Sequence, residues 1–305
     1  MSNENDRRED LALGMASAAG GIFMFAVMNA FAKYLSARHS VVEIAFYRNL
    51  VGSLPFLVYV FAFSHRDILV IRSKRLLVAT RALLGSVTLM VTFGAYSLMP
   101  MAETSVLLFT ASLWIPILGM LLLKERVGPF RWSAVIVGFL GVAVMLDPSG
   151  QVSRLGVALA LGAAFLQAML NILLRHLGGH ERPETISLYF FLIGTLITGL
   201  AMPFVARPVE LAELPLFLGL GFSGATAQIL YTVALKHTPA AIVAVFNYTS
   251  IVWSMLFGWL IWQDWPLPIV LAGASVVIAA NLLIVWRENR LRRRTAGYDW
   301  RGNDG

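Results

Sequence analysis

Ten apolar runs follow one another along the chain, and a short polar or basic link separates each run from the next. A hydrocarbon core about 30 Å thick is crossed by about 20 apolar residues in a helix, which satisfies its own backbone hydrogen bonds in lipid. The pattern therefore predicts an all-α polytopic membrane protein with ten transmembrane helices near 11–36, 41–63, 75–98, 102–123, 129–146, 153–176, 184–204, 213–236, 239–262 and 266–286.

The composition agrees with a protein that lies in lipid. Of the 305 residues, 58% are hydrophobic and 13% are charged, which is too little polar material to cover a soluble surface. The chain has no cysteine for disulfides or thiolate metal sites, and its five histidines are scattered. We therefore expect no metal and no cofactor. The opening MSNENDRRED lacks the features of a cleaved secretory signal, so we expect the first helix to be retained.

The basic residues predict how the helices are oriented. With both termini in the cytoplasm, 18 of the 24 Lys and Arg residues fall on the cytoplasmic side and four on the opposite side. This bias predicts a multi-pass protein of the cell inner (plasma) membrane with both termini cytoplasmic. The basic segment RENRLRRR after the last helix is typical of an anchor at an anionic lipid leaflet, and we expect no nucleic-acid partner.

Two stretches of the chain resemble each other closely enough to indicate a duplication. Residues 95–137 superpose on 234–276 without a gap and with ten identities, and residues 13–54 superpose on 155–196 with fourteen. The pairs include Asn, Tyr, Trp and Pro, which recur in register less readily than Gly, Ala or Leu. We therefore expect a cytoplasmic tail at 1–10, a first five-helix repeat at 11–149, a second at 150–286, and a basic cytoplasmic tail at 287–305.

An odd number of helices in each repeat places the second repeat upside down relative to the first. Two inverted halves can pack in two nearly equivalent ways, so that a central cavity opens to one side of the membrane or to the other. The duplication therefore predicts a transporter that works by alternating access.

The residues also resemble a known family. The stretches YRNLVGSLPFL and RALLGSVTLMVTFGAYSLMPMAETSVLLFTASLWIPILGMLLLKERVGPFRW, together with the second-half echo, resemble the drug/metabolite transporter superfamily, EamA type, and within it the aromatic and neutral amino-acid exporters. Glu125 and Asp264 keep the acid-then-Pro pattern that closes the fourth and ninth helices. The resemblance implies a central cavity formed by the first, third, fourth, sixth, eighth and ninth helices.

Polar and aromatic side chains in the middle of the helices are candidates for contact with a solute, because polar groups are costly in lipid. Each could instead join neighbouring helices through packing or a hydrogen bond. We expect Asn247, Tyr248, Gln228 and Trp253 to converge near the pseudo-two-fold axis. The full set of candidate substrate-binding residues is Asn247, Tyr248, Gln228, Trp253, Gln167, Thr88, Phe109 and Trp114.

Charged residues and glycines within the helices form a second group of candidates. Arg48 is expected to pair with Glu43 or Glu103, as an outer gate or as a structural anchor, and Arg81 to extend its side chain toward the interface or to attract a carboxylate. The repeat mates Gly85 and Gly224 are candidate hinges, with close helix packing as the alternative.

Together these features favour a secondary transporter that exports amino acids or related small metabolites. Export of lipophilic drug-like compounds is the alternative, but a cation site would require a mid-helix acid, and the sequence has none. A non-transporting receptor or structural protein would not require the duplication. An intramembrane protease at Gly221, Ser223 and Gly224 is disfavoured because His237 lies about 21 Å along the same helix. We therefore expect no enzyme, with a small-molecule solute and the bilayer as partners; substrate, ion coupling and oligomeric state stay open.

Overall fold

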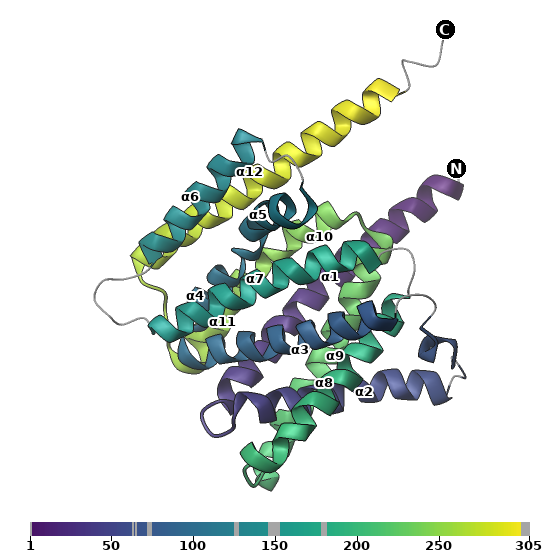
Figure 1. Cartoon of the computed structure of the whole chain (residues 1–305), viewed down its shortest axis with the longest axis vertical. Helices are drawn as coiled ribbons and strands as arrows, with labels where there is room; N and C mark the ends of the chain where they lie inside the picture. The colour runs from purple at the N-terminus through teal and green to yellow at the C-terminus, as the bar shows by residue number, and fades with distance from the viewer. Residues whose placement is uncertain are drawn as a thin grey trace.

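The computed structural model describes residues 2–62, 64, 66–71, 75–124, 128–145, 153–177 and 182–299. These residues form helices and contain no strand (Figure 1). The helices are α1 (Ser2–Leu35), α2 (Val41–Ala62), η1 (Arg66–Leu69), α3 (Arg75–Leu98), α4 (Met101–Leu108), α5 (Ala111–Leu123), α6 (Pro129–Met145), α7 (Arg154–Leu177), α8 (Pro183–Val205), η2 (Leu211–Glu213), α9 (Leu214–His237), α10 (Ala240–Asn247), α11 (Thr249–Trp262) and α12 (Pro268–Asp299).

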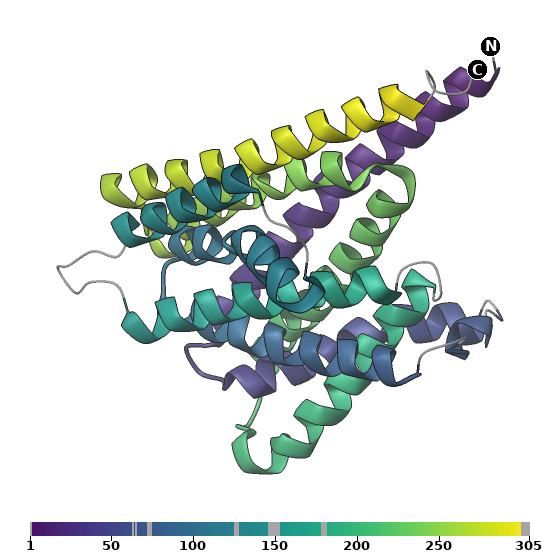
Figure 2. The same cartoon turned by 45° about the horizontal axis from the view of Figure 1, so that its top comes forward.

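The helices confirm the prediction of an all-α polytopic membrane protein. In the described residues, eight helical segments are long and apolar enough to cross a membrane, and two shorter apolar helices, Trp132–Met145 and Pro268–Leu283, complete the set of ten. Two helices run further than predicted, because α1 begins at Ser2 and α12 continues to Asp299. The start of α1 and the end of α12 project from the same end of the molecule (Figures 1 and 2), as an even number of crossings requires.

The predicted fourth and ninth helices are each divided in two, which corrects the continuous helices expected over 102–123 and 239–262. The divisions lie at Phe109–Thr110 and at Tyr248. The hydroxyl groups of Thr110 and Thr249 donate hydrogen bonds to the carbonyls three residues earlier, at 2.6 and 2.7 Å. Such bonds compete with the backbone ladder and bend a helix. Thr110 and Thr249 are repeat mates, so the same hydroxyl-to-carbonyl bond occurs at both breaks.

The repeated Gly, acid and Pro pattern encodes the end of a helix. Lys124 and Gln263 are repeat mates that follow α5 and α11 in the left-handed conformation, with φ values of 56° and 60°. Their backbone N–H groups donate to the carbonyls of Gly119 and Gly258, which closes the last turn of each helix. Glu125 lies outside the described residues. The Oδ2 atom of Asp264 lies 3.8 Å from the Nζ atom of Lys33 on α1.

The contacts between the two repeats follow a pseudo-two-fold axis. The pair α1 and α9 is the counterpart of α7 and α3, while α2 meets its own counterpart α8 and α6 meets α12. Ring contacts repeat as well: Trp253 meets Phe23 of α1 at 4.9 Å, and Trp114 meets Phe165 of α7 at 5.3 Å. Since Trp114 is the mate of Trp253 and Phe165 that of Phe23, one contact is the symmetry copy of the other.

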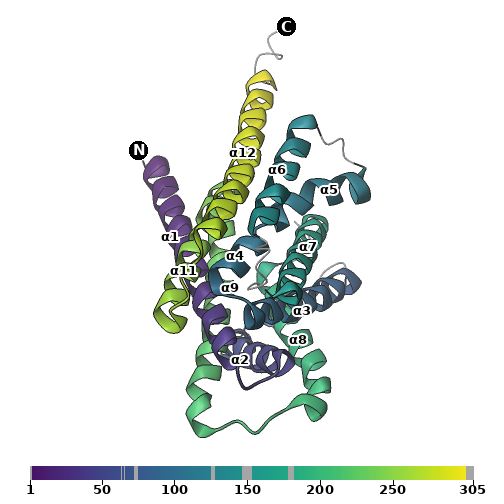
Figure 3. The same cartoon turned by 90° about the vertical axis from the view of Figure 1, so that its left-hand side faces the viewer.

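The layer formed by α6 and α12 lies at one side of the molecule (Figures 2 and 3). These helices approach closely at Gly141 and Gly273, where a Cβ on Gly273 would come within 2.5 Å of the Gly141 carbonyl oxygen. The remaining helices are therefore left to build the centre of the molecule.

Candidate substrate-binding site

The two divided helices meet at their breaks through a pair of stacked rings. Phe109, at the end of α4, and Tyr248, between α10 and α11, lie with their ring centroids 5.1 Å apart and their planes 14° apart. The two residues are repeat mates, so the pseudo-two-fold axis passes between them. Both are half-buried. The sequence-predicted residues Phe109 and Tyr248 are therefore in contact at the junction of the two repeats.

A polar cluster of side chains from α1, α3, α4 and α11 surrounds the Tyr96 hydroxyl. Two of its members, Ser105 and Ser250, lie close in sequence to Phe109 and Tyr248. Asn29 of α1 donates to this hydroxyl at 3.4 Å, and the side chains of Ser105 of α4 and Ser254 of α11 lie close to it. Ser105 lies 3.5 Å from Ser250. The sequence reasoning missed Tyr96, Ser105 and Ser254. The spacing of Ser250 and Ser254, one helical turn apart, was the available signal, because it puts both hydroxyls on one face.

The other expected residues of this site are more dispersed than predicted. Asn247 immediately precedes Tyr248 and is half-buried. Trp253 packs edge-on against Phe23. The side chain of Gln228 donates a 3.2 Å hydrogen bond to Ser187 of α8, which places its amide in the contact between α8 and α9.

Three further candidates lie apart from the stacked rings. Trp114 packs against Phe139 and Phe165, and its buried Nε1 has no hydrogen-bond partner in the described structure. Thr88 is buried and donates to the Leu84 carbonyl of the preceding turn at 2.7 Å. Gln167 is exposed on α7.

Arg48 does not make the ion pair expected from the sequence. No ion pair within the described residues joins it to Glu43 or Glu103; its guanidinium instead lies over the Phe191 ring at 4.5 Å and beside Phe190 at 5.1 Å. The reason is the position of α8, which lies along α2 and presents these rings to Arg48. Arg81 of α3 lies over Phe190 as well, at 4.8 Å.

Glu43 belongs to a charged network that joins the two repeats at the η2 end of the molecule. Buried His39 lies between two carboxylates, with Nδ1 3.1 Å from Glu43 and Nε2 3.1 Å from Glu213. Arg38 pairs with Glu213 at 3.1 Å and with Glu210 at 2.5 Å. The hydrogen bond from Arg38 holds the pKa of the Glu210 carboxyl below its usual value.

Glu103 lies in a different part of the molecule. It is 7% exposed, and Lys33 and Asp264 are the charges that act on it. Lys33 also donates to the Met99 carbonyl at 2.7 Å.

The two candidate hinge glycines sit in unbroken helices against bulky neighbours. A Cβ on Gly85 would come within 3.0 Å of Arg81 Nη1 and of the Phe190 ring, and a Cβ on Gly224 within 2.9 Å of Arg48 Nε. Both glycines thus provide room for an arginine, which favours the packing alternative over the hinge.

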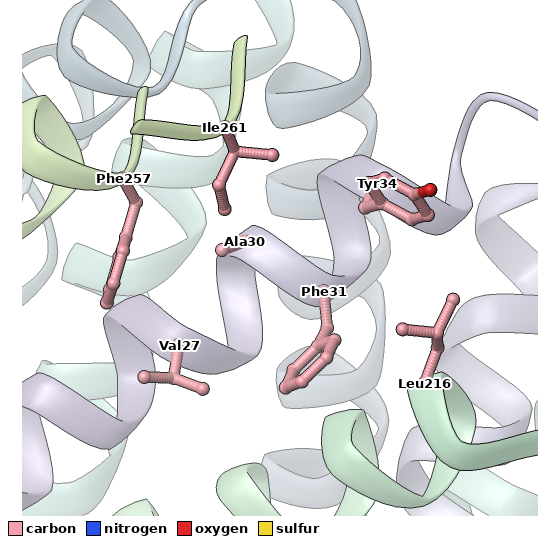
Figure 4. A pocket seen from close by; sticks show the side chains of 7 residues that line it. All are labelled: Val27, Ala30, Phe31, Tyr34, Leu216, Phe257 and Ile261. Atoms are coloured by element: carbon pink, nitrogen blue, oxygen red, sulfur yellow. The ribbon is translucent and has the colours of Figure 1, made fainter. Parts of the chain in front are cut away.

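An apolar pocket of about 350 Å³ lies between α1, α9 and α11 (Figure 4). Its lining side chains are Val27, Ala30, Phe31, Tyr34, Leu216, Phe257 and Ile261. The wall of the pocket is apolar, so it offers little polar specificity.

Comparison with known proteins agrees with this architecture. The chain is 29% identical to a pseudopaline exporter of Pseudomonas aeruginosa over 90% of this chain and 96% of that protein, and 32% identical to a riboflavin transporter of Rhizobium johnstonii over 71% and 72%. An S-adenosylmethionine uptake transporter of Rickettsia bellii is 25% identical over 94% and 98%.

A solved crystal structure shares the fold with a TM-score of 0.64 and 16% identity, covering 93% of this chain and 99% of the other. The family described as "EamA-like transporter family" matches the chain twice, over residues 12–147 and 154–286. The relatives are named as transporters, which agrees with transport and not with enzymatic catalysis. This chain therefore belongs to the EamA-like transporter family, within the drug/metabolite transporter superfamily.

Proposed function

We propose that this secondary transporter exports amino acids or related small metabolites across the inner (plasma) membrane. The observation that carries the proposal is the stack of Phe109 on Tyr248 at the breaks of two symmetry-related helices. Broken helices at the interface of inverted repeats are where transporters bind their solutes. In this proposal residues 11–149 and 150–286 are the two halves that move, and 1–10 and 287–305 are their cytoplasmic tails.

Polar contacts at two ends of the molecule support alternating access. At the η2 end, Arg38 of the first repeat pairs with Glu210 and Glu213 of the second. At the η1 end, Asp67 of the first repeat pairs with Arg182 of the second, and the Tyr189 hydroxyl donates to the Leu69 carbonyl at 2.9 Å. Each end would have to open while the other stays closed. The exposed pairs Arg38–Glu210 and Asp67–Arg182 can break at modest free-energy cost, whereas opening of the η2 end must also separate buried His39 from Glu213.

The chemistry of the polar cluster around Tyr96 favours an uncharged or zwitterionic solute over a cation. Asn29, Tyr96, Ser105, Ser250 and Ser254 offer hydroxyl and amide groups and no carboxylate. A lipophilic cation, the alternative substrate, would be bound without a counter-charge there. The named solutes of the relatives, pseudopaline, riboflavin and S-adenosylmethionine, are small metabolites, which supports a small-metabolite substrate but does not discriminate by charge.

Uptake into proteoliposomes tests the proposal. Purified protein would be reconstituted and offered labelled L-phenylalanine, L-tryptophan, L-alanine and a lipophilic cation, each with and without a pH gradient, with protein-free vesicles as the control. We expect saturable uptake of at least one amino acid. Uptake of the cation alone would replace the proposed substrate class by the alternative, and uptake of none would contradict amino-acid export.

A further inference from the structure

Two arginines lie between α2, α3 and α8 without a carboxylate partner among the described residues: Arg48 is buried and Arg81 is half-buried. Arg48 is 1% exposed; its Nη1 donates to Asn49 Oδ1 at 2.9 Å, while its Nε has no acceptor. The buried Nε and Nη1 of Arg81 have none either, nor does the Nδ2 of Asn49. Four donor nitrogens are thus left without an acceptor in one small region of the described structure.

The two guanidinium groups share one aromatic side chain. The Arg48 and Arg81 Cζ atoms lie 5.1 and 4.8 Å from the centroid of the Phe190 ring, and Arg48 also lies 4.5 Å from that of Phe191. A cation gains less free energy from an aromatic ring than removal of the ion from water costs. The rings therefore leave a large part of that cost uncompensated.

Glycines make the space in which these polar groups lie. A Cβ on Gly194 would come within 2.5 Å of Asn49 Nδ2, one on Gly224 within 2.9 Å of Arg48 Nε, and one on Gly85 within 3.0 Å of Arg81 Nη1. The three glycines come from three different helices, α8, α9 and α3. A larger residue at any of them would collide with one of these donors, so the glycines are what allows the polar side chains to lie there.

The duplication shows that the scaffold itself does not need these charges. When residues 13–54 of the first repeat are aligned with residues 155–196 of the second, Arg48 corresponds to Phe190 and Asn49 to Phe191. The symmetry-related position in the second repeat is therefore filled by apolar rings, and α2 and α8 still pack across the axis there. The polar residues belong to one repeat alone, at a place where an apolar residue serves the fold.

We propose that Arg48, Asn49 and Arg81 form a binding site for a carboxylate group of the transported solute. Because all four free atoms are donors, the ligand group must be an acceptor, and two neighbouring cations require that it be an anion. A carboxylate accepts two parallel N–H bonds from a guanidinium fork. This inference rests on the proposed function and narrows its substrates to solutes with a carboxylate, such as an amino acid or an organic acid.

Thermal unfolding in detergent tests the site apart from transport. The melting temperature of the parent protein would be measured with 50 mM sodium benzoate, sodium citrate or L-phenylalanine, and with sodium chloride or benzamide as controls at matched ionic strength. We expect at least one carboxylate to raise the melting temperature by about 2 °C or more relative to chloride and benzamide. If none does so, the inference is wrong.

Variants separate binding from a structural role of the arginines. Without ligand, Arg48→Met and Arg81→Met should melt at the parent temperature or above it, because each removes an unpaired buried charge. They should also lose the shift caused by the carboxylate. Arg48→Lys and Arg81→Lys keep the charge and should retain part of that shift. Arg154→Met, which changes an exposed arginine, is the matched control and should respond as the parent does.

Two other outcomes contradict the inference. If the Met variants melt lower and keep the full carboxylate shift, the arginines are structural. If phosphatidylglycerol in mixed micelles stabilises the parent and the three carboxylates do not, the anion is a lipid headgroup. Uptake assays decide the proposed function separately. If the Met variants take up amino acids as the parent does, the carboxylate site is wrong and the proposed function stands. If a carboxylate raises the melting temperature but no amino acid is taken up, the site stands and the proposed function is wrong.

Discussion

At the scale of single residues, the pair Phe109 and Tyr248 shows how a duplicated position acquires a new property. Both side chains are aromatic, so the stack across the axis is preserved, but Tyr248 adds a hydroxyl that Phe109 lacks. No hydrogen bond of this hydroxyl occurs within the described structure. A solute that stacks on or bonds to Tyr248 would therefore meet one ring with a polar group and one without.

Replacement of Tyr248 is the sharpest test at this scale. Tyr248→Ala removes both the ring and the hydroxyl, so we expect the affinity for a transported solute to fall roughly five- to 150-fold, as about 1–3 kcal/mol predicts. Tyr248→Phe should keep the part of the solute affinity that is due to stacking on the ring. Uptake kinetics in proteoliposomes would give the apparent affinity.

The control for this prediction is Phe222→Ala, which removes an aromatic ring that is 47% exposed on α9. Its affinity should equal that of the parent. Normal solute affinity in Tyr248→Ala combined with a lower melting temperature would mean that the ring serves packing alone.

At the scale of elements, the ends and breaks of the helices carry the repeat most clearly. Thr110 and Thr249 divide the fourth and ninth predicted helices, and Lys124 and Gln263 end them in the left-handed conformation. A side chain with a Cβ adopts that conformation at a cost of about 1–2 kcal/mol, which glycine avoids. Both features recur at equivalent positions of the two repeats, and the chain places no glycine at either helix end.

Substitution of Gln263 tests the helix end. Gln263→Gly should raise the free energy of unfolding by up to about 1 kcal/mol, because glycine removes the left-handed strain. The larger conformational entropy of the unfolded chain with glycine offsets part of this stabilisation. Gln263→Ile should lower it, because a β-branched residue fits φ of 60° poorly. Thermal unfolding of the two variants measures the difference, and equal melting temperatures would show that the helix end is not strained.

At the scale of the whole molecule, the two repeats are joined by polar contacts at two ends and by aromatic contacts at the centre. Arg38 and Glu210 join the repeats near η2, and Asp67 and Arg182 join them near η1. Inverted halves that rock against each other must break these contacts in turn.

Cross-linking tests this movement, and the absence of native cysteines makes it direct. We expect Arg38→Cys with Glu210→Cys, joined by a short bis-maleimide, to lower solute uptake at least about tenfold, because one end can then no longer open. Asp67→Cys with Arg182→Cys should do the same at the other end. The single-cysteine variants treated with the same reagent are the controls. Uptake at the parent rate after complete cross-linking would contradict alternating access.

The membrane orientation is a second property of the whole molecule. From the uneven distribution of Lys and Arg we expect tags at residues 2 and 305 to be cytoplasmic. Protease protection in spheroplasts would show both tags protected until the membrane is permeabilised. A C-terminal tag digested in intact spheroplasts would overturn this orientation and the even number of crossings.

The sequence alone determined the membrane class, the approximate helix positions and the duplication, because hydropathy and repeat identity are local or linear properties of a chain. It also identified Phe109 and Tyr248, which share one position of the repeat. It did not predict the helix breaks beside them, since threonine hydroxyls also bond backbone carbonyls within unbroken helices, as Thr88 and Thr92 do in α3.

Only the tertiary structure decided the partners of the charged residues. Arg48 has acids near it along the predicted outer side, and charge alone favoured an ion pair with Glu43 or Glu103. In the fold, Glu43 faces His39, Glu103 faces Lys33, and α8 brings the Phe190 and Phe191 rings to Arg48. The physical reason is that a buried side chain interacts with whatever its neighbouring helices present. Helix neighbours are fixed by packing across the pseudo-two-fold axis, which no single stretch of sequence records.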